Sequence, residues 1–474
     1  MSPEEFRASG HQVVDWIADY LRDVREYPVL AQTTPGALIA SLPPSGPDRG
    51  EPMEAILEDF RKLILPGITH WNHPRFFAYF SISGSGPGIL GEMLAAALNV
   101  NHMLWKTSPA ATELEQVTLG WLRQWLGLPG EFFGIIHDTA STSTMHAILA
   151  AREAAAPQAR LTGEFPALVL YTSEHANSSV DKAALAVGVG LSHIRHIACD
   201  DQFRMRPEAL ESQIEADLAA GLTPFCVVPT VGTTSTSSID PVARVGEVAR
   251  GFGLWMHVDA AYAGPAAVLE EFRHILDGAA QADSLVVNPH KWLFTPVDLS
   301  VLYLKRPEVM RRAVSLAEVP PYLASNDQAV NLTEYSVQLG RRFRSLKLWF
   351  VLRYYGREGI AAVLREQMRV AAELTGTIPR DERFEIAAPT LFSLVCFRYR
   401  GSDEENRELL DRINATGRAF LSGTQLHGRF VLRLAIGNLA ASREDVMETW
   451  ELVRSLAPVP TDHGSVPPGS ASPA

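Results

Sequence analysis

The chain has 474 residues, 46% of them hydrophobic and 20% charged, and its 42 basic and 54 acidic residues give a net charge of -12. This acidic balance excludes nucleic acid or an anionic membrane as the main partner. No apolar run approaches the roughly 20 residues of a membrane span, and the N-terminus lacks a secretory signal, so we expect a cytoplasmic protein. The three cysteines are far apart, which predicts neither a disulfide framework nor a zinc site.

Residues 1–84 are predicted to form a helical and extended segment that wraps another surface. Apolar residues recur near a 3.6-residue period over 2–27 and again over 53–65, which predicts two helices, and a Pro/Gly-rich stretch separates them. An aromatic segment, 70–80, follows. It either packs as a cluster or forms the wall of a pocket for a flat apolar ligand, with three candidate residues: Trp71, Tyr79 and Phe80.

Residues 85–359 are predicted to form a large α/β domain, because short apolar runs alternate with helical patterns. Such alternation predicts a mainly parallel sheet covered by helices on both faces. The predicted strands are 134–137, 167–171, 193–198, 225–228, 254–258 and 284–287. The predicted helices are 89–97, 110–126, 142–155, 180–187, 207–220 and 338–356.

The end of the chain is predicted to contain a lid, a smaller domain and a tail. Residues 309–330 include paired prolines and polar residues, which we interpret as a long exposed loop that acts as a lid. Residues 360–457 mix helical patterns with strand-like runs at 391–399 and 429–436, which predicts a small α+β domain. The Pro/Ser/Gly-rich residues 458–474 are predicted to be a disordered tail.

Two residues at the ends of predicted strands indicate a catalytic site, because ligands bind at the carboxyl ends of the strands in α/β sheets. Lys291 follows the strand 284–287, and a lysine desolvated there can form a Schiff base with a carbonyl carbon. Asp259 ends another strand, and a buried carboxylate requires a positive partner such as a protonated pyridine nitrogen. A single lysine in such a place is more often a surface residue that follows a core strand, so it is the combination with Asp259 that predicts a site.

Three further features lie after other predicted strands. The hydroxyl-rich loop 137–143 precedes a helix and suits a phosphate group, although Thr or Ser there can equally be a plain helix cap. His175 and Thr230 each follow a strand. Alone, the first indicates a structural histidine and the second a turn, but together with Lys291 and Asp259 they strengthen the prediction of one site.

With these features the sequence resembles the group II decarboxylases of fold type I, which depend on pyridoxal phosphate, and within them the aromatic L-amino-acid decarboxylases. The resemblance extends from Glu5 to about Leu456. It is most specific in His257-Val-Asp-Ala-Ala-Tyr-Ala-Gly264, Asn288-Pro-His-Lys-Trp292 and Leu339-Gly-Arg-Arg-Phe-Arg344. It implies a homodimer with active sites at the interface, in which the lid reaches the partner's site.

The resemblance also implies a role for each matching residue. Lys291 matches the lysine that carries pyridoxal phosphate, Asp259 the acid beside the pyridine nitrogen, and Tyr322 the lid tyrosine that protonates the substrate's α-carbon after carbon dioxide leaves. The other implied cofactor contacts are His175 and Ala261 on the two ring faces, with Thr230, Ala140, Ser141, Asn288 and His290. The implied substrate contacts are Trp71, Tyr79, Phe80, Met103 and Gly340. Asp138 departs from the resemblance, since many members have Gly there.

The predicted reaction is decarboxylation of an aromatic L-amino acid, of the tryptophan, tyrosine, phenylalanine or DOPA type, to its amine. An aldehyde synthase is the alternative. In the resemblance that activity accompanies loss of the tyrosine at 322 or the histidine at 175, and both are present. The aromatic segment argues against glutamate as the substrate. A metal hydrolase using His257, Asp259 and His290 lacks a recognisable third-ligand spacing and leaves Lys291 unexplained. A cofactor-free interaction protein has no support.

Overall fold

The centre of the molecule is a seven-stranded sheet made from short, buried, apolar strands. The structure is a computed structural model that describes residues 1–315 and 329–458. The strand order is β1-β7-β6-β5-β4-β2-β3. The bounds are β1 Phe133–His137, β2 Leu168–Ser173, β3 Ile194–Ile197, β4 Thr223–Val228, β5 Trp255–Asp259, β6 Ser284–Val287 and β7 Ser300–Leu304.

Strand direction confirms the predicted mainly parallel sheet. Strands β2 to β6 pair in parallel with their neighbours, whereas β7 runs antiparallel between β6 and β1. All residues of β2, β5 and β6 are buried, as expected for strands covered by helices on both faces. All six predicted strands are present, and a further strand that was not predicted, β7, corresponds to the apolar run Ser300-Val-Leu-Tyr-Leu304.

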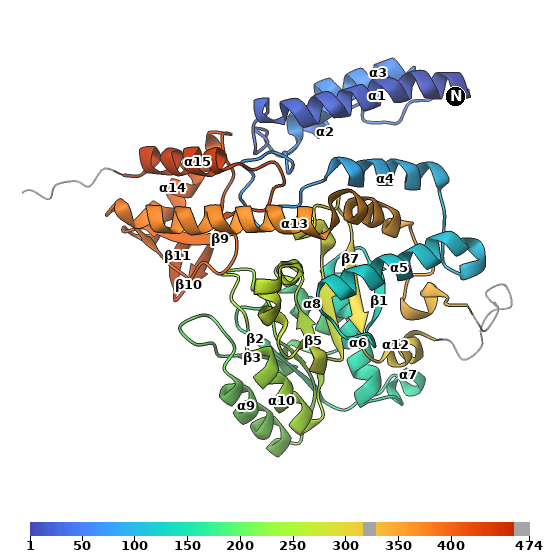
Figure 1. The fold of residues 1–474 in the computed structure, drawn as a ribbon, viewed down its shortest axis with the longest axis vertical. Coiled ribbons are helices and arrows are strands. Elements are labelled where there is room, and N and C mark those ends of the chain that lie inside the picture. The colour runs from blue at the N-terminus through green and yellow to red at the C-terminus, as the bar shows by residue number, and fades with distance from the viewer. Residues whose placement is uncertain (316–328, 459–474) are drawn as a thin grey trace, which may run out of the picture.

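Helices surround this sheet (Figure 1). They are α4 Gly86–Leu98, α5 Pro109–Trp125, α6 Ala140–Ala155, α7 Ala159–Thr162, α8 Ser179–Ala186, α9 Pro207–Ala219, α10 Val242–Phe252, α11 Pro289–Trp292, α12 Pro307–Val314 and α13 Arg344–Thr377. Two predictions need correction. The helix predicted over 338–356 begins only at Arg344, and residues 309–314 belong to α12 rather than to an exposed loop. The remainder of that predicted lid, residues 316–328, lies outside the described residues.

A second sheet forms in the C-terminal part of the chain. Its order is β10-β11-β9-β8 and all its pairs are antiparallel. The bounds are β8 Phe384–Ile386, β9 Leu394–Tyr399, β10 Ser422–Leu426 and β11 Arg429–Ala435, with helices α14 Asp403–Ala415 and α15 Arg443–Leu456. The strand-like runs at 391–399 and 429–436 are therefore confirmed. This sheet has its own hydrophobic cluster, which includes Phe397 and Trp450.

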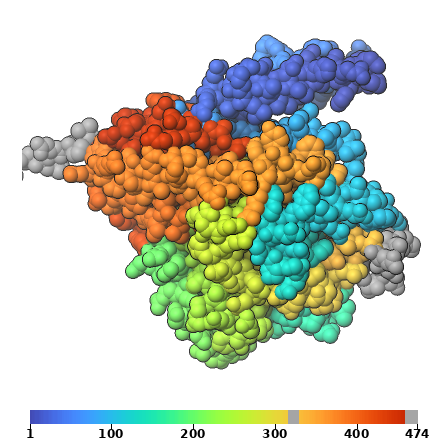
Figure 2. Space-filling model, viewed as in Figure 1, coloured from blue at the N-terminus to red at the C-terminus, as the bar shows by residue number. Residues whose placement is uncertain are grey.

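The N-terminal helices lie along one side of the molecule, as the blue segment at the top of Figure 2 shows. They are α1 Pro3–Asp23, α2 Ala37–Ser41 and α3 Met53–Asp59. Ser2 and Glu5 form a capping box at the start of α1. No residue of α1 is buried, so this helix contributes nothing to a core within the chain. None of the helices in the described part of the chain is long and apolar enough to cross a membrane.

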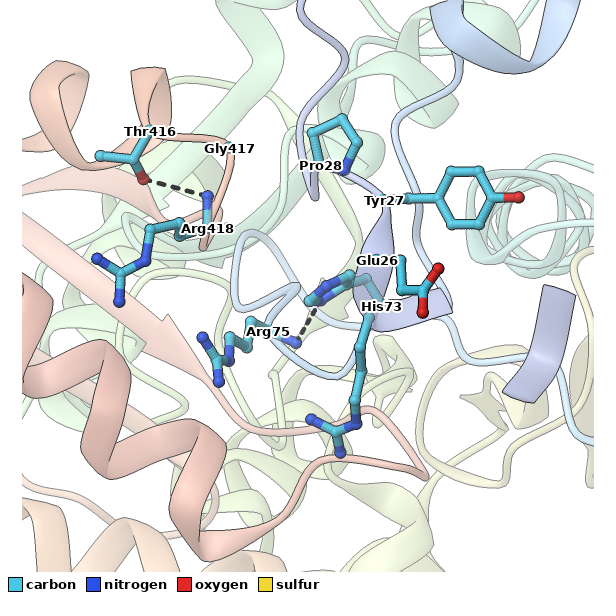
Figure 3. Close-up of a pocket in the computed structure, with 9 residues that line it drawn as sticks. Glu26, Tyr27, Pro28, His73, Arg75, Thr416, Gly417 and Arg418 are labelled. Carbon is cyan, nitrogen blue, oxygen red and sulfur yellow. Dashed lines mark hydrogen bonds between the residues drawn. The ribbon is translucent and has the colours of Figure 1, made fainter. Parts of the chain in front are cut away.

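The N-terminal segment joins the C-terminal sheet region through backbone and charge contacts. The Val29 N–H donates to the Gly417 carbonyl over 2.8 Å, and the His70 N–H donates to the Val29 carbonyl over 2.9 Å. Arg25 and Arg75 both pair with the buried Asp445 of α15. Figure 3 shows the polar pocket at this junction, which has a volume of about 400 Å³. The start of the chain is thereby fixed to α15.

Candidate active site

The loops that follow β1, β4, β5 and β6 meet at the carboxyl edge of the central sheet and enclose a cavity of about 180 Å³. This is the edge where ligands bind in open α/β sheets. Nine of the candidate residues line the cavity: Phe80, Ala140, Ser141, Thr230, Asp259, Ala261, Asn288, His290 and Lys291. The structure therefore brings the strand-end residues predicted from the sequence into one place.

Lys291 and Asp259 form the electrostatic centre of the cavity. Burial lowers the pKa of Lys291, and the charge of Asp259 opposes this shift. Burial raises the pKa of Asp259, while Lys291 and the backbone N–H of Ala261, which donates to Oδ1 over 3.0 Å, oppose that shift. When Lys291 is protonated, its charge favours the ionised form of the buried carboxylate. A lysine whose pKa is lowered by burial is also a better nucleophile, because more of it is uncharged near neutral pH.

Two buried oxygens in this cavity have no hydrogen-bond partner among the described residues: Thr230 Oγ1 and Asn288 Oδ1. Buried polar atoms are normally paired, so such atoms indicate where a bound group would make contacts. The backbone of Thr230 is held firmly, since its N–H donates to Asp240 Oδ2 over 2.8 Å. The cavity therefore presents fixed but unused polar groups to a ligand.

The start of α6 offers an anion site on one side of the cavity. Thr139 is the N-cap, and Ala140 and Ser141 are the first helical residues, whose N–H groups have no partner within the helix. The carboxylate of Asp138 accepts the Thr139 N–H over 2.6 Å, so this residue has a local structural role beside the proposed phosphate site.

His290 is suited to donate a hydrogen bond into the same cavity. Its Nδ1 accepts the Leu299 N–H over 2.9 Å, which leaves the proton on Nε2 when the ring is neutral. Burial lowers the pKa of His290 to about 3, so the ring stays neutral at ordinary pH. A neutral imidazole N–H can contact an anionic group without adding a charge to the buried site.

Aromatic rings form another wall. Phe80 stacks on Tyr262 with centroids 3.6 Å apart, and Tyr262 stacks on Trp292 with centroids 5.1 Å apart. The Nζ of Lys291 lies 5.5 Å from the centre of the Phe80 ring. Sequence reasoning missed Tyr262 as a lining residue, although it lies inside the motif 257–264. It also missed Thr139, Asn177, Ser179, Gly232 and Thr234, which line the cavity as well.

Several candidates do not line this cavity. The ring of His175 instead packs edge-on against Phe203, with centroids 5.2 Å apart. Trp71 borders a different pocket, with Pro296 and Val297, and Tyr79 is 54% exposed. Met103 and Gly340 lie outside the cavity lining, and Tyr322 lies outside the described residues. The roles of these six residues stay predictions.

Comparisons with known proteins agree with this site. The model of the Pyridoxal-dependent decarboxylase conserved domain matches residues 35–400. The chain is 41% identical to a phenylacetaldehyde synthase from Arabidopsis thaliana, over 96% of each protein. It is 42% identical to an aromatic-L-amino-acid decarboxylase from Bos taurus, over 96% of this chain and 97% of the relative.

Among solved structures, a crystal structure of Oryza sativa TDC with PLP and tryptamine is similar, with a TM-score of 0.92 and 36% identity. The similarity covers 96% of this chain and 98% of that one. The chain therefore belongs to the pyridoxal-dependent decarboxylase family. Its fold is the predicted fold type I, and its cofactor is pyridoxal phosphate. The unpaired oxygens, the anion site and Lys291 in the 180 Å³ cavity fit that cofactor.

Proposed function

We propose that the protein decarboxylates an aromatic L-amino acid to the corresponding amine and carbon dioxide. The observation that carries this proposal is the cavity that joins Lys291 and Asp259 to an anion site and an aromatic wall. The names of the relatives support this substrate class: one is called an aromatic-L-amino-acid decarboxylase, and a similar crystal structure holds tryptamine.

The proposed roles follow the positions of the lining residues. Lys291 would hold the aldehyde carbon of pyridoxal phosphate, Asp259 its ring nitrogen, and Ala261 one face of its ring. The phosphate contacts would come from Ala140, Ser141, Asn288 and His290, with Thr230 beside the ring. When bound, the cofactor supplies an electron sink for the electrons released as carbon dioxide leaves.

The chain's own residues prepare this chemistry. Burial favours the uncharged, nucleophilic form of Lys291. The buried Asp259 places a fixed carboxylate at the carboxyl end of β5, where an opposing positive charge is stabilised without rearrangement of solvent. The stacked rings of Phe80, Tyr262 and Trp292 exclude water from one side of the cavity.

The proton that replaces carbon dioxide decides the product. We assign its return to Tyr322, whose presence supports the amine as the product. The resemblance implies His175 as a neighbouring imidazole, but its ring packs against Phe203 outside the cavity lining, to which the same turn contributes Asn177. The alternative is an aldehyde synthase, the name of one relative at 41% identity. That reaction consumes oxygen and water and releases aldehyde, carbon dioxide, ammonia and hydrogen peroxide.

A product assay tests this choice. Purified protein loaded with pyridoxal phosphate is incubated separately with tryptophan, tyrosine, phenylalanine and DOPA, and amine, aldehyde and peroxide are measured. We expect amine as the main product of at least one substrate. In Tyr322→Phe we expect cofactor binding to persist while amine falls and aldehyde and peroxide rise. Undiminished amine production by Tyr322→Phe would show that another group returns the proton, and aldehyde from the unmodified protein would favour the synthase.

We also infer a homodimer, because two helices expose apolar side chains that nothing in the described chain covers. Helix α1 exposes Phe6 and Val14, and α4 exposes Leu90, Leu94 and Leu98. Soluble monomers rarely expose large contiguous apolar patches. An apolar groove of about 710 Å³, lined by Phe6 and Val14 of α1 and Met93 of α4 among others, joins the two helices. A second copy of this chain is the proposed occupant of this surface.

A further inference from the structure

Three metal-ligating side chains meet next to the proposed active site. Strands β2 and β3 pair in parallel with Ser173 opposite Ile197, so the residues that follow these positions emerge side by side. Glu174 and His175 come directly after β2, and Cys199 comes two residues after β3. One ligand atom from each of these three side chains lies within 4.8 Å of the other two.

Backbone contacts hold this cluster together. The Glu174 N–H donates to the Ile197 carbonyl over 3.1 Å, and the Cys199 N–H donates to Glu174 Oε1 over 2.9 Å. The His175 N–H donates to Ser173 Oγ over 3.0 Å. Within the described residues, the ring nitrogens of His175 take part in no hydrogen bond, so the imidazole is available to a ligand.

The donor set is one that zinc-class ions prefer: a carboxylate oxygen, an imidazole nitrogen and a thiol sulfur. Ligand distances of about 2.0–2.3 Å place neighbouring ligand atoms about 3.3–3.8 Å apart in a tetrahedral site, so small side-chain rotations would complete the site. Glu174 is exposed and the other two side chains are partly exposed, so an ion can reach them from solvent. Cysteine spacing did not predict this group, because strand pairing brings its members together.

We propose that Glu174, His175 and Cys199 bind a zinc-class divalent ion, and that the bound ion inhibits turnover. On binding, the thiol proton passes to solvent, bonds form from the ion to sulfur, nitrogen and oxygen, and no group is oxidised or reduced. Binding would fix the turn 174–177, which also carries Asn177 of the cavity lining, and so would restrict adjustment of the cavity during turnover. The inhibitory part rests on the proposed function, since it concerns turnover in that cavity.

The place of the cluster explains how it would act on the cavity. Asn177, two residues after His175, lines the cavity and donates to Thr234 Oγ1 over 3.0 Å. The same turn therefore carries one residue of the ion site and one of the cofactor cavity. An ion held by His175 would fix this turn directly beside the place where the reaction occurs.

Cadmium is the probe for the site, because a thiolate bound to Cd²⁺ gives an ultraviolet charge-transfer band that does not depend on enzyme activity. Protein loaded with pyridoxal phosphate is titrated with Cd²⁺, and the band and the rate of product formation are recorded together. We expect the band to saturate at one ion per chain. It should be lost in Cys199→Ser, and Glu174→Gln should weaken binding by at least about tenfold, as loss of a ligand requires.

Cys396→Ser is the matched control, because Cys396 is a free thiol in the C-terminal sheet, away from this cluster. We expect its band to equal that of the unmodified protein. Cd²⁺ should lower the rate of product formation at least tenfold in the unmodified protein and less than twofold in Cys199→Ser. A band that survives in Cys199→Ser, no band at all, or equal inhibition in both proteins would overturn the proposal.

The two proposals fail in different ways. If the ion site is absent but the proposed function is right, the protein forms amine and Cd²⁺ produces no band that depends on Cys199. If the proposed function is wrong but the ion site exists, the band forms and depends on Cys199 and Glu174, although no aromatic amino acid is decarboxylated.

Discussion

At the scale of single residues, burial and charge have opposite effects on the pKa values of Lys291 and Asp259. Burial disfavours the charged form of each residue, and each residue's charge favours the charged form of the other. Removal of the charge of one residue should therefore shift the pKa of the other residue. This makes Asp259 the most informative residue to change without loss of the lysine.

For Asp259→Asn we predict a decrease in turnover by about two to three orders of magnitude, as expected when a preorganised charge is lost from a buried site. The pKa of Lys291 should fall further, because the charge that raises it is gone. Turnover is measured at saturating pyridoxal phosphate, and the pKa of Lys291 is measured in the protein without the cofactor.

Asp283→Asn is the matched control for this change. Asp283 is a partly buried carboxylate that immediately precedes β6, at the end of the strand opposite to the cavity. We expect its turnover to remain within about twofold of the unmodified protein, since Asp283 lies outside the cavity and an asparagine keeps an oxygen that can accept the Met256 N–H. Equal losses in both variants would indicate general destabilisation rather than a role for Asp259.

The sequence predicted those site residues that follow strands directly, because the motif and the strand end are local. It therefore placed Lys291, Asp259 and Asn288 at one edge before any contact was known. It missed Tyr262, whose ring reaches the cavity by stacking between Phe80 and Trp292. It also missed the meeting of His175 with Cys199, because the register between β2 and β3 is a property of the folded sheet.

At the scale of elements, the close approach of α4 and α13 shows why certain glycines are needed. A Cβ atom added at Gly91 would lie 2.7 Å from the Cα of Lys347. Backbone atoms cannot move aside as a flexible side chain can. Lys347 is itself buried, and its Nζ pairs with Glu92 Oε2 over 2.9 Å, so the contact is fixed on both sides.

We predict that Gly91→Ala lowers the free energy of unfolding by about 1–3 kcal/mol through overpacking. Gly86→Ala is the matched control in the same helix, because a Cβ there meets no atom within 4 Å. That change should have little effect or stabilise by up to about 1 kcal/mol. Urea unfolding of both variants measures the difference. Unfolding midpoints that agree for Gly91→Ala and Gly86→Ala would contradict the described packing of α4 on α13.

The elements of the central sheet were predictable because buried parallel strands appear as continuous apolar runs between helices. In the second sheet, β9 and β11 were predicted but β8 and β10 were not. Strand β10, Ser422-Gly-Thr-Gln-Leu426, contains few apolar residues and is held by its antiparallel pairing with β11. The start of α13 was misplaced, because residues 338–343 form loop contacts instead. One of these is the Arg341 N–H, which donates to Asn101 Oδ1 over 2.9 Å. We retain as a proposal the division into residues 1–84, 85–359, 360–457 and 458–474.

At the scale of the whole molecule, the exposed apolar faces of α1 and α4 are the feature that a single copy leaves unexplained. Helix α1 buries none of its residues within the chain, yet carries Phe6 at 66% exposure. A charged residue placed in such a face should therefore act on assembly rather than on the fold of one copy.

We predict a dimeric mass in solution. We expect Leu94→Glu to raise the dissociation constant of the dimer at least about tenfold, because a buried, unpaired charge at an interface is strongly unfavourable. Leu161→Glu is the matched control, since Leu161 is 74% exposed on α7 and away from α1 and α4. Sedimentation at several concentrations gives the masses. A monomeric unmodified protein, or equal weakening by both changes, would contradict the dimer proposed through this surface.

The proposed role of Lys291 as the residue that holds pyridoxal phosphate predicts a spectrum and a product. We would record the visible absorbance and product formation of the unmodified protein and Lys291→Ala, each supplied with the cofactor and an aromatic L-amino acid. Lys305→Ala, which changes a partly exposed lysine in a surface ion pair, is the control. We predict a Schiff-base absorbance band and amine formation in the unmodified protein and the control, and neither in Lys291→Ala. Amine formation by Lys291→Ala, or an unmodified protein without the band, would show that Lys291 does not hold the cofactor.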